Sequence, residues 1–508
     1  MKNKKKLALL SCFLTLALTA NAKELSLEER VEQLEKLLQQ QIEKNIELEK
    51  QINLKEEKDI KSEEKIVKVQ EKTTTDIEIK ELDTRLAKLE KEAEKWEVHG
   101  YASLQYRSTD DFSSSATTFG KGDLFLGIPG TGESANQVEF VIKRKFEGKN
   151  GVFGDLNLRA EYGNGDSYYY SSSGSEHDYG RGHFEVKEAF INMGGFDYLP
   201  ENSTIWAGRR FLNRNSTALS GEFYKQSSGV GFGYERNGLS LSVMAADPQD
   251  GNNKKVELED NNGRKTVTAF DINYAGIQVP GGSLDLGAKY YIQPNAKEKV
   301  KGGSANPDAA KEGFGLGIVY NTNYYGFDGF ASHAINYGQG VGAHATGGMN
   351  FGSWTDNANE DAWVTLLTSG GMLNLNDNWQ LMTEATLMHG DKLYGLSGEL
   401  TRAGLSIQPS YKVNDNFRWV FGATAGLQRV EDYDKNWGGL QGRTEYRVGL
   451  SIAPTFTADS DFFGRPQIQP FVTWMHSNFT TDFNNMNFHD LEKGKSQVIF
   501  GVKSEVWF

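Results

Sequence analysis

The chain has 508 residues, a formal net charge of −13, 12% aromatic residues, 56 glycines and only 10 prolines. The negative charge argues against a nucleic-acid partner, because phosphate backbones attract basic surfaces. The single cysteine, Cys12, leaves the rest of the chain without a disulfide or a thiol nucleophile. Abundant glycine and aromatic residues with little proline favour an all-β barrel, in which alternating strands give a low mean hydropathy, here −0.55.

The first 22 residues are predicted to form a secretory signal peptide. Lysines at positions 2 and 4–6 precede the apolar run Leu7–Ala20, and Ala20-Asn21-Ala22 has the small-x-small pattern of a cleavage site. The apolar run is too short for a membrane-spanning helix. We therefore expect an exported protein and exclude residues 1–22 from the fold.

An α-helical coiled coil is predicted for residues 23–96. Seam residues recur in steps of three and four from Val31 to Ile52, apolar except for Gln41 and Asn45, and again from Ile79 to Trp96. No glycine or proline interrupts the segment. A stripe of this kind is buried only against other helices, so we expect several copies of the segment to form one bundle. The alternative is a single solvated helix, which the regular spacing disfavours.

Residues 97–508 are predicted to form a transmembrane β-barrel. Alternating segments of roughly ten residues are separated by clusters of Gly, Asn, Asp and Ser, as in the strands and turns of such a barrel. At roughly 23 residues per strand and connection, the region predicts about 18 antiparallel strands, and an even number is expected. Representative predicted strands are Val138–Phe146, Gly154–Tyr162, Phe184–Met193, Ser283–Ile292, Trp379–Met388, Arg418–Leu427 and Ile468–Met475.

Long polar stretches between these strands are predicted to be loops at one end of the barrel. They are Ser108–Gly122, Gly163–Gly182, Asp247–Arg264, Asn295–Lys311, Gly338–Asn359 and Asn478–Lys495. With an even number of strands, both ends of the barrel chain are expected at the opposite end, together with the short turns.

The last strand, Val498–Phe508, has one apolar face and one polar face. Lys503, Glu505 and Trp507 share one parity, and most apolar residues of the strand share the other. Aromatic residues in a barrel usually belong to lipid-facing girdles, so a ring on the polar face needs a different partner. The flat CH face of a pyranose ring stacks on indole, and its hydroxyl groups suit neighbouring charges. The position of Trp507 therefore predicts sugar binding inside a pore.

No pattern of catalytic or metal-binding residues appears in the sequence. The eight histidines are scattered, and we find no metal-ligand spacing, nucleophile elbow or phosphate-binding glycine loop. We therefore predict that the protein is not an enzyme and uses no metal or cofactor.

Five segments of the barrel region carry specific patterns. They are His99–Ala102, Ser203–Phe211 with Asn213 and Arg214, Leu450–Pro454, Phe462–Pro466 and the ending Glu505–Phe508. In this order they resemble the motifs of the maltoporin and sucrose-porin family of sugar-specific outer-membrane porins. The resemblance covers nearly all of residues 97–508, and the segment before them is similar to the coiled coil of the sucrose porin. It implies a homotrimeric barrel in the outer membrane, with the coiled coil in the periplasm.

The resemblance also implies a row of aromatic residues along the channel, which we call the aromatic slide. Its matching positions are Tyr101, Phe223, Phe327, Phe463, Trp507 and Tyr179. A polar track beside the slide is matched by Glu139, Lys187 and Arg214. Ser103 and Gly221 replace a family arginine and a family constriction aspartate, which implies a wider pore and a sucrose-porin-like or broader sugar specificity.

Together these features predict a channel for passive, facilitated diffusion of sugars such as maltose, maltodextrins or sucrose. The expected partners are small-molecule sugars, membrane lipid and further copies of the chain in a homotrimer. Two alternatives stay open. A general or anion-selective porin would have a charged constriction and no file of rings, whereas a structural protein would use the coiled coil to tether the outer membrane to the cell wall.

Overall fold

The computed structural model describes residues 85–86, 90, 92–110, 125–131, 137–163, 183–246, 257–259, 265–299, 301, 306–344, 346–351, 359–393, 397–431, 444–478 and 495–508. The chain divides into two compact units, residues 1–90 and 91–508. Only helical residues 85, 86 and 90 of the first unit are described. The predicted signal peptide and nearly all of the predicted coiled coil therefore lie outside the described residues.

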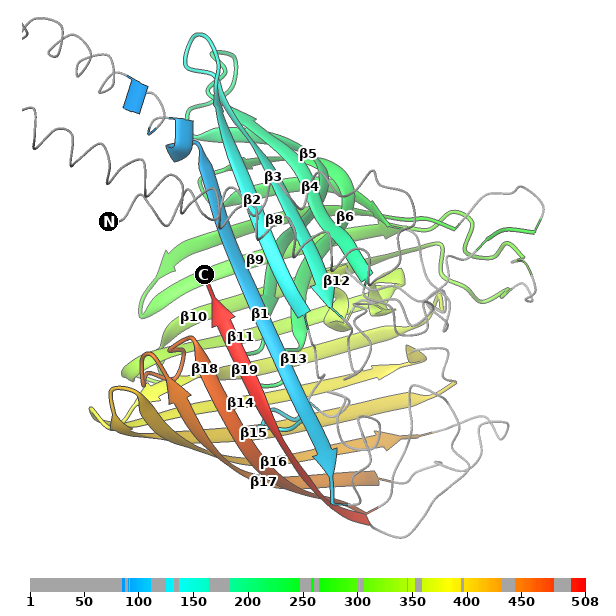
Figure 1. Cartoon of the computed structure of the whole chain (residues 1–508). Coiled ribbons are helices and arrows are strands. Elements are labelled where there is room, and N and C mark those ends of the chain that lie inside the picture. The colour runs from blue at the N-terminus through cyan, green and yellow to red at the C-terminus, as the bar shows by residue number, and fades with distance from the viewer. Residues whose placement is uncertain are drawn as a thin grey trace, which may run out of the picture. The chain divides into compact units, whose positions relative to one another are not determined.

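The second unit is a closed barrel of antiparallel strands (Figure 1). In the part of the chain that the structure describes, nineteen strands share one hydrogen-bonded sheet. Eighteen of them form the wall, because the two-residue strand β12 lies apart from it. Wall strands that follow each other in the chain are paired, and β1 pairs with β19 to close the barrel. The prediction of about 18 antiparallel strands is therefore confirmed.

The wall strands are β1 (Trp96–Thr109), β2 (Gln137–Glu147), β3 (Phe153–Gly163), β4 (His183–Gly194), β5 (Ser203–Ser216), β6 (Phe223–Arg236), β7 (Leu239–Ala246), β8 (Val267–Val279), β9 (Gly282–Ile292), β10 (Glu312–Tyr324), β11 (Phe327–Gly340), β13 (Trp363–Asn374), β14 (Trp379–Asp391), β15 (Glu399–Asn414), β16 (Phe417–Val430), β17 (Thr444–Thr457), β18 (Gln467–Ser477) and β19 (Lys495–Trp507). The remaining strand, β12 (Asn350–Phe351), pairs in parallel with β6.

The two ends of the barrel differ in their connections. One end has brief turns such as 237–238 and 415–416, and it also holds the start of β1 and the end of β19. We call it the short-turn end. The opposite, long-loop end has connections such as 164–182 and 478–494. The described strand ends that flank the predicted polar loops all lie at the long-loop end.

Side chains alternate between the two faces of the wall, as the two-residue period of a strand requires. On β1, Leu104 and Tyr106 are about half exposed on the outer face, whereas Ser103, Gln105 and Arg107 are buried on the inner face. On this strand the outer face is thus apolar, as a lipid-facing band must be, and the inner face is polar.

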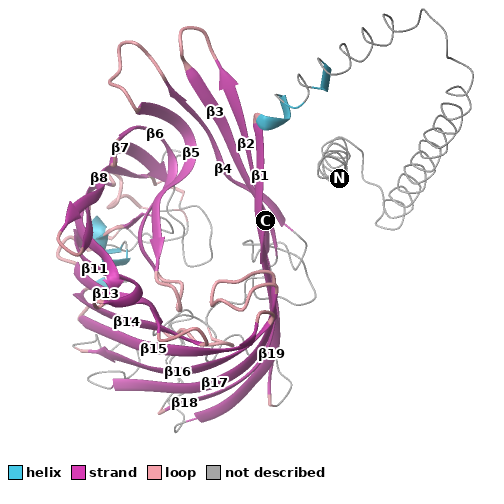
Figure 2. Ribbon diagram, turned by 90° about the vertical axis from the view of Figure 1, so that its left-hand side faces the viewer, coloured by secondary structure: helices cyan, strands magenta, loops and turns pink. Residues whose placement is uncertain are grey.

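One side of the interior is filled by chain that folds inward from the long-loop end (Figure 2). The short helices η2 (Val341–His344) and η3 (Thr346–Gly348) pack against the inner face of β10 and β11. Only glycine fits beneath them, since an ideal Cβ on Gly315 would lie 1.8 Å from the carbonyl oxygen of Gly348. Apolar side chains such as Phe351 are fully buried there, so this side of the barrel has a packed core.

Three further segments turn into the interior, and we call them the inward segments. Residues 125–131 and 217–222 come from the long-loop end, and residues 458–466 come from the short-turn end. Arg418 on β16 fixes the last of them, because its guanidinium donates to the carbonyl oxygens of Asp461 at 2.6 Å and Phe462 at 3.1 Å. The inward segments narrow the interior and bring loop residues next to wall residues.

Candidate solute-binding surface inside the barrel

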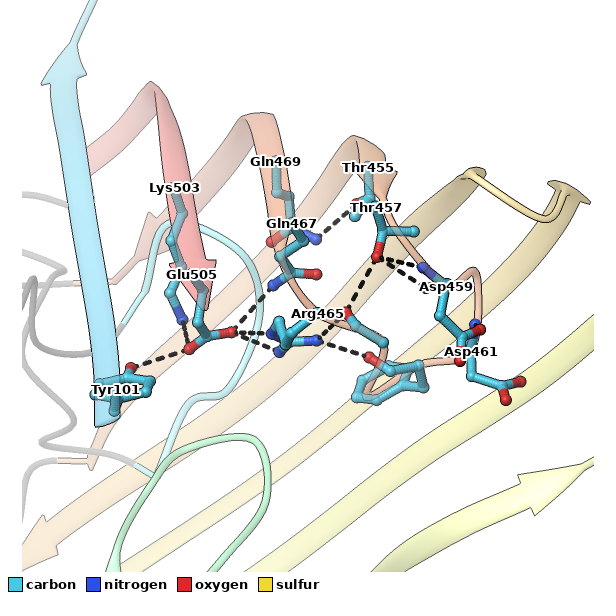
Figure 3. Close-up of polar contacts among 12 residues, drawn as sticks. Tyr101, Thr455, Thr457, Asp459, Asp461, Arg465, Gln467, Gln469, Lys503 and Glu505 are labelled. Carbon is cyan, nitrogen blue, oxygen red and sulfur yellow. Dashed lines mark hydrogen bonds and ion pairs between the residues drawn. The ribbon is translucent and has the colours of Figure 1, made fainter. Parts of the chain in front are cut away.

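Tyr101 and Trp507 are directly paired where β1 meets β19 near the short-turn end. Both lie on the inner parity, together with the buried carboxylate of Glu505. The Tyr101 hydroxyl donates to Glu505 Oε1 at 3.0 Å, and the Arg465 guanidinium contacts Glu505 Oε2 at 2.5 Å (Figure 3). Lys503 Nζ lies 3.1 Å from Glu505 Oε1. The ring that the sequence assigns to the polar face therefore lies beside a network of charged groups.

Arg465 belongs to the inward segment 458–466 and also covers the Trp507 ring. Its guanidinium carbon lies 4.7 Å from the centroid of that ring, which is a cation–π distance. Trp507 is nevertheless 47% exposed, so much of the indole stays open to the lumen. Neither Arg465 nor Glu505 is among the positions matched to the polar track, although both lie within the motifs that carry the family resemblance.

Charged side chains alternate in sign across the inner face of β2, β3 and β4. Arg159 joins two carboxylates, with Nη1 3.4 Å from Glu139 Oε2 and Nε 2.8 Å from Glu188 Oε2. Lys187 lies 2.8 Å from Glu185 Oε2. The register shifts between Arg159 and the next residue of β3, which makes Lys187 the extra residue of a bulge and keeps it on the same face as Glu188. We call this group the charged ladder.

The charged ladder continues onto the β5–β6 hairpin. The backbone amide of Phe211 donates to Glu188 Oε1 at 2.8 Å. The Arg214 guanidinium carbon then lies 5.0 Å from the Phe211 ring centroid and 4.3 Å from the Phe223 ring centroid. Four predicted positions, Glu139, Lys187, Arg214 and Phe223, thus share one continuous surface. Phe211 is not among the predicted slide positions, although it is the last residue of the specific motif Ser203–Phe211.

The tip of the β5–β6 hairpin, inward segment 217–222, crosses the interior to the opposite wall. Glu384 on β14 accepts the backbone amide of Leu219 at 2.7 Å and that of Ser220 at 3.2 Å. The Ser220 hydroxyl also donates to this carboxylate. No single strand pattern could reveal this contact, because β14 lies far from the hairpin in both the sequence and the sheet order.

Inward segment 125–131 lies against the hairpin tip and completes the narrowing. The Gly127 amide donates to Ser406 Oγ at 2.8 Å, and Gln408 Nε2 donates to the Gly127 carbonyl oxygen at 2.9 Å. An ideal Cβ on Gly127 would lie 2.5 Å from Leu219, so the two inward segments are in close contact. We call this pair of segments the constriction.

Gly221 lies at the hairpin tip with a positive φ of 74°. An ideal Cβ at this position would meet no atom within 4 Å among the described residues. A larger side chain at this position would therefore meet no described atom. Ser103, the other small replacement, is buried on the inner face opposite Glu505.

The remaining slide positions are less close together. Phe463 lies in inward segment 458–466, and its ring centroid is 6.1 Å from that of Phe330 and 5.3 Å from that of Phe462. Phe327 is 66% exposed at the start of β11, beyond an irregularity in the register with β10. The ring that β11 presents to Phe463 is therefore Phe330, which the sequence did not single out. Tyr179 lies outside the described residues.

The described residues also bear on metal binding and on helical membrane spans. No group of three or more His, Cys, Asp or Glu side chains is arranged to hold a metal ion within the described ranges. None of the helices described is both long enough and apolar enough to span a bilayer.

A protein-family model described as LamB porin matches residues 126–508. Similar solved structures include Acinetobacter baumannii OccAB2, which is 11% identical, with 82% of this chain and 98% of that chain covered and a TM-score of 0.43. Pseudomonas aeruginosa OprD is 10% identical, with 82% and 95% covered and a TM-score of 0.40. The trimer form of Vibrio cholerae OmpT is 9% identical, with 81% and 99% covered and a TM-score of 0.34. The family model spans nearly the whole barrel, so this chain belongs to the LamB porin family, and its barrel is a porin-type channel of the outer membrane.

Proposed function

We propose that the barrel carries sugars across the outer membrane by passive, facilitated diffusion. The observation that supports this most directly is the continuous inner surface that runs along the charged ladder and the paired rings of Tyr101 and Trp507. Pyranose rings stack their CH faces on aromatic rings, and their hydroxyl groups both donate and accept hydrogen bonds. A surface that offers rings, cations and carboxylates side by side suits this chemistry.

The paired charges of the ladder are suited to binding polar solutes that are rich in hydroxyl groups. Arg159, Glu139 and Glu188 neutralise one another in part, yet the side chains of Arg159 and Glu139 stay 25% and 17% exposed. A passing hydroxyl group therefore meets donors and acceptors at short intervals. Many weak sites in a row let a solute bind and also leave, which a channel requires.

A planar-bilayer experiment with the full-length protein tests the proposal. Maltose, maltodextrins and sucrose are expected to reduce the ion current in a saturable way, because a bound sugar obstructs the lumen. Trp507→Ala should weaken the block about fivefold, which corresponds to about 1 kcal/mol for one aromatic contact. Trp474→Ala is the matched control, because this tryptophan lies on the outer parity of β18 and is 39% exposed. A current that none of these sugars reduces would overturn the proposal in favour of a general porin.

We also propose that the channel is a homotrimer whose segments 23–96 associate in the periplasm. The heptad pattern of that segment supports the proposal, since its apolar stripe needs partner helices. Chemical cross-linking of the full chain in membranes should give a trimer band, and deletion of residues 23–96 should leave sugar transport intact. Loss of envelope integrity after that deletion would support an additional tethering role for the segment.

A further inference from the structure

A cavity of about 170 Å³ lies inside the barrel beside the constriction. Strands β1, β15, β16, β18 and β19 contribute to its lining, together with residues from all three inward segments. Three cations line it, Arg418, Arg465 and Lys503, along with four glutamines that include Gln467 and Gln469. None of the described residues lining the cavity is acidic. We call it the cationic cavity, and its lining differs from the sign-alternating charged ladder.

The carboxylates closest to these cations do not line the cavity, and their negative charge does not fully offset the positive charge of the lining. Glu505 binds both Arg465 and Lys503, and Asp459 lies on the inward segment held by Arg418. Three cations and these two carboxylates leave one net positive charge at the cavity. A further pair just outside it, Lys412 with Asp461, cancels internally.

Arg418 is the cavity cation that has no carboxylate oxygen in direct contact among the described residues. It is 2% exposed, and its guanidinium donates to neutral acceptors, the Asp461 and Phe462 carbonyl oxygens and Gln467 Oε1 at 2.6 Å. Its Nε has no hydrogen-bond partner among the described residues. A buried cation whose hydrogen bonds go to neutral acceptors attracts an anion, because little water screens its charge.

The cationic cavity also adjoins the aromatic slide. Arg465 lines the cavity and lies over the Trp507 ring, at 4.7 Å from its centroid. Phe462 lines the cavity and contacts the slide ring Phe463 at 5.3 Å between centroids. A pyranose ring stacked at this end of the slide would thus hold its substituents within reach of the cations.

From this juxtaposition we propose that the channel selects carbohydrates that carry one anionic group, a carboxylate or a phosphate. The inference rests on the proposed sugar-channel function and names its substrate class. Arginine recognises carboxylate and phosphate through paired hydrogen bonds, and lysine adds a point charge. A neutral sugar can stack on the aromatic rings, but it has no anionic group to pair with the surplus positive charge of the cavity.

Planar-bilayer titrations with the full-length protein test the proposal by comparing solutes that share one ring. Glucuronate and glucose 6-phosphate should block the ion current at concentrations at least tenfold lower than glucose. Lys503→Gln should remove most of this preference, so that the blocking concentrations of glucuronate and glucose approach each other. Lys143→Gln is the matched control, because Lys143 lies on the inner face of β2 but does not line the cavity. This variant should keep the preference for anionic sugars.

The outcomes separate this inference from the proposed function. Equal block by glucose and glucuronate overturns the anionic preference and leaves the sugar channel standing. A preference that survives Lys503→Gln overturns the assignment to this cavity. Acetate and inorganic phosphate are titrated separately as anions without a sugar ring. Block by these ions at the same concentrations as the anionic sugars would show an ion site without sugar recognition, and would overturn the proposal. Absence of block by every sugar would overturn the proposed function itself.

Discussion

The Glu384 carboxylate on wall strand β14 accepts the backbone amide of Ser220, which lies at the tip of a hairpin rooted in β5 and β6. The amide of Leu219 and the Ser220 hydroxyl donate to the same carboxylate. Glu384 is 2% exposed. These donors therefore replace the hydrogen bonds to water that the carboxylate gives up on burial. One side chain therefore ties the constriction to the far wall of the barrel.

Replacement of this carboxylate should loosen the constriction. Glu384→Gln keeps the size of the side chain but removes the charge that strengthens each hydrogen bond, at a cost of about 1–2 kcal/mol. We expect a higher single-channel conductance with larger current fluctuations, because the hairpin tip then leaves its position more often. Single-channel recording in a planar bilayer measures both. Glu399→Gln is the control, since that carboxylate is exposed, and equal effects of the two substitutions would contradict the anchoring role.

A side chain at Gly221 should narrow the pore. Gly221→Asp adds a carboxylate at a position where an ideal Cβ meets no atom within 4 Å. Aspartate tolerates the left-handed region better than most residues, at a cost of roughly 1 kcal/mol for the φ of 74°. The conductance should fall, and cation selectivity should rise. Gly326→Asp is the matched control. Gly326 also has a positive φ, 90°, and an open Cβ site, but it lies in a turn at the short-turn end. An unchanged conductance in Gly221→Asp would refute the placement of the hairpin tip.

Much of the wall could be predicted from the sequence, whereas the interior could not. Alternation along Val498–Phe508 was enough to place Trp507 with Lys503 and Glu505 on the inner face, because parity in a strand is a local property. The partner of Glu384 was not predictable in this way. It depends on how far a hairpin folds inward, and that distance is decided by packing between segments remote in the chain.

The slide illustrates a different limit, that of a family pattern applied to a single strand. Phe327 was selected by its position in a family pattern, but the register between β10 and β11 is irregular between Thr322 and Tyr324. Gly329 near the start of β11 has a φ of 130°, a conformation that side chains rarely adopt. The pairing of β11 with β13 stays regular from Gly329 onward, so alternation places Phe330 on the same parity as the buried Ala334 and Asn336, whereas the family pattern points to Phe327.

The structure therefore predicts that Phe330 contributes more to solute binding than Phe327 does. Phe330→Ala removes the ring 6.1 Å from that of Phe463 and should weaken sugar block of the current by about threefold to tenfold. Phe327→Ala removes a ring that is 66% exposed at the start of the strand and should change the block less than twofold. Bilayer titration with a maltodextrin compares the two variants directly. The reverse order of effects would restore the position chosen from the family pattern.

Arg159 should control the charge balance of the ladder. It bridges Glu139 at 3.4 Å and Glu188 at 2.8 Å, so Arg159→Gln leaves two carboxylates without their shared cation. We expect a shift of the reversal potential toward cation selectivity in a salt gradient, because the inner surface then carries one more net negative charge. Sugar block should also weaken, since Glu188 loses the partner that orients it toward the Phe211 amide.

A matched control separates this local effect from a general loss of positive charge. Arg429→Gln removes a cation that pairs with Glu431 at 2.5 Å and is 49% exposed on the outer parity of β16. The reversal potential should stay near the wild-type value in that variant, because bulk salt screens an exposed charge outside the lumen. A second variant, Arg159→Lys, keeps the charge but cannot span both carboxylates as a fork. If Arg159→Lys restores ion selectivity but not sugar block, orientation by the guanidinium matters for the solute, whereas full recovery of both would reduce the role of Arg159 to its charge.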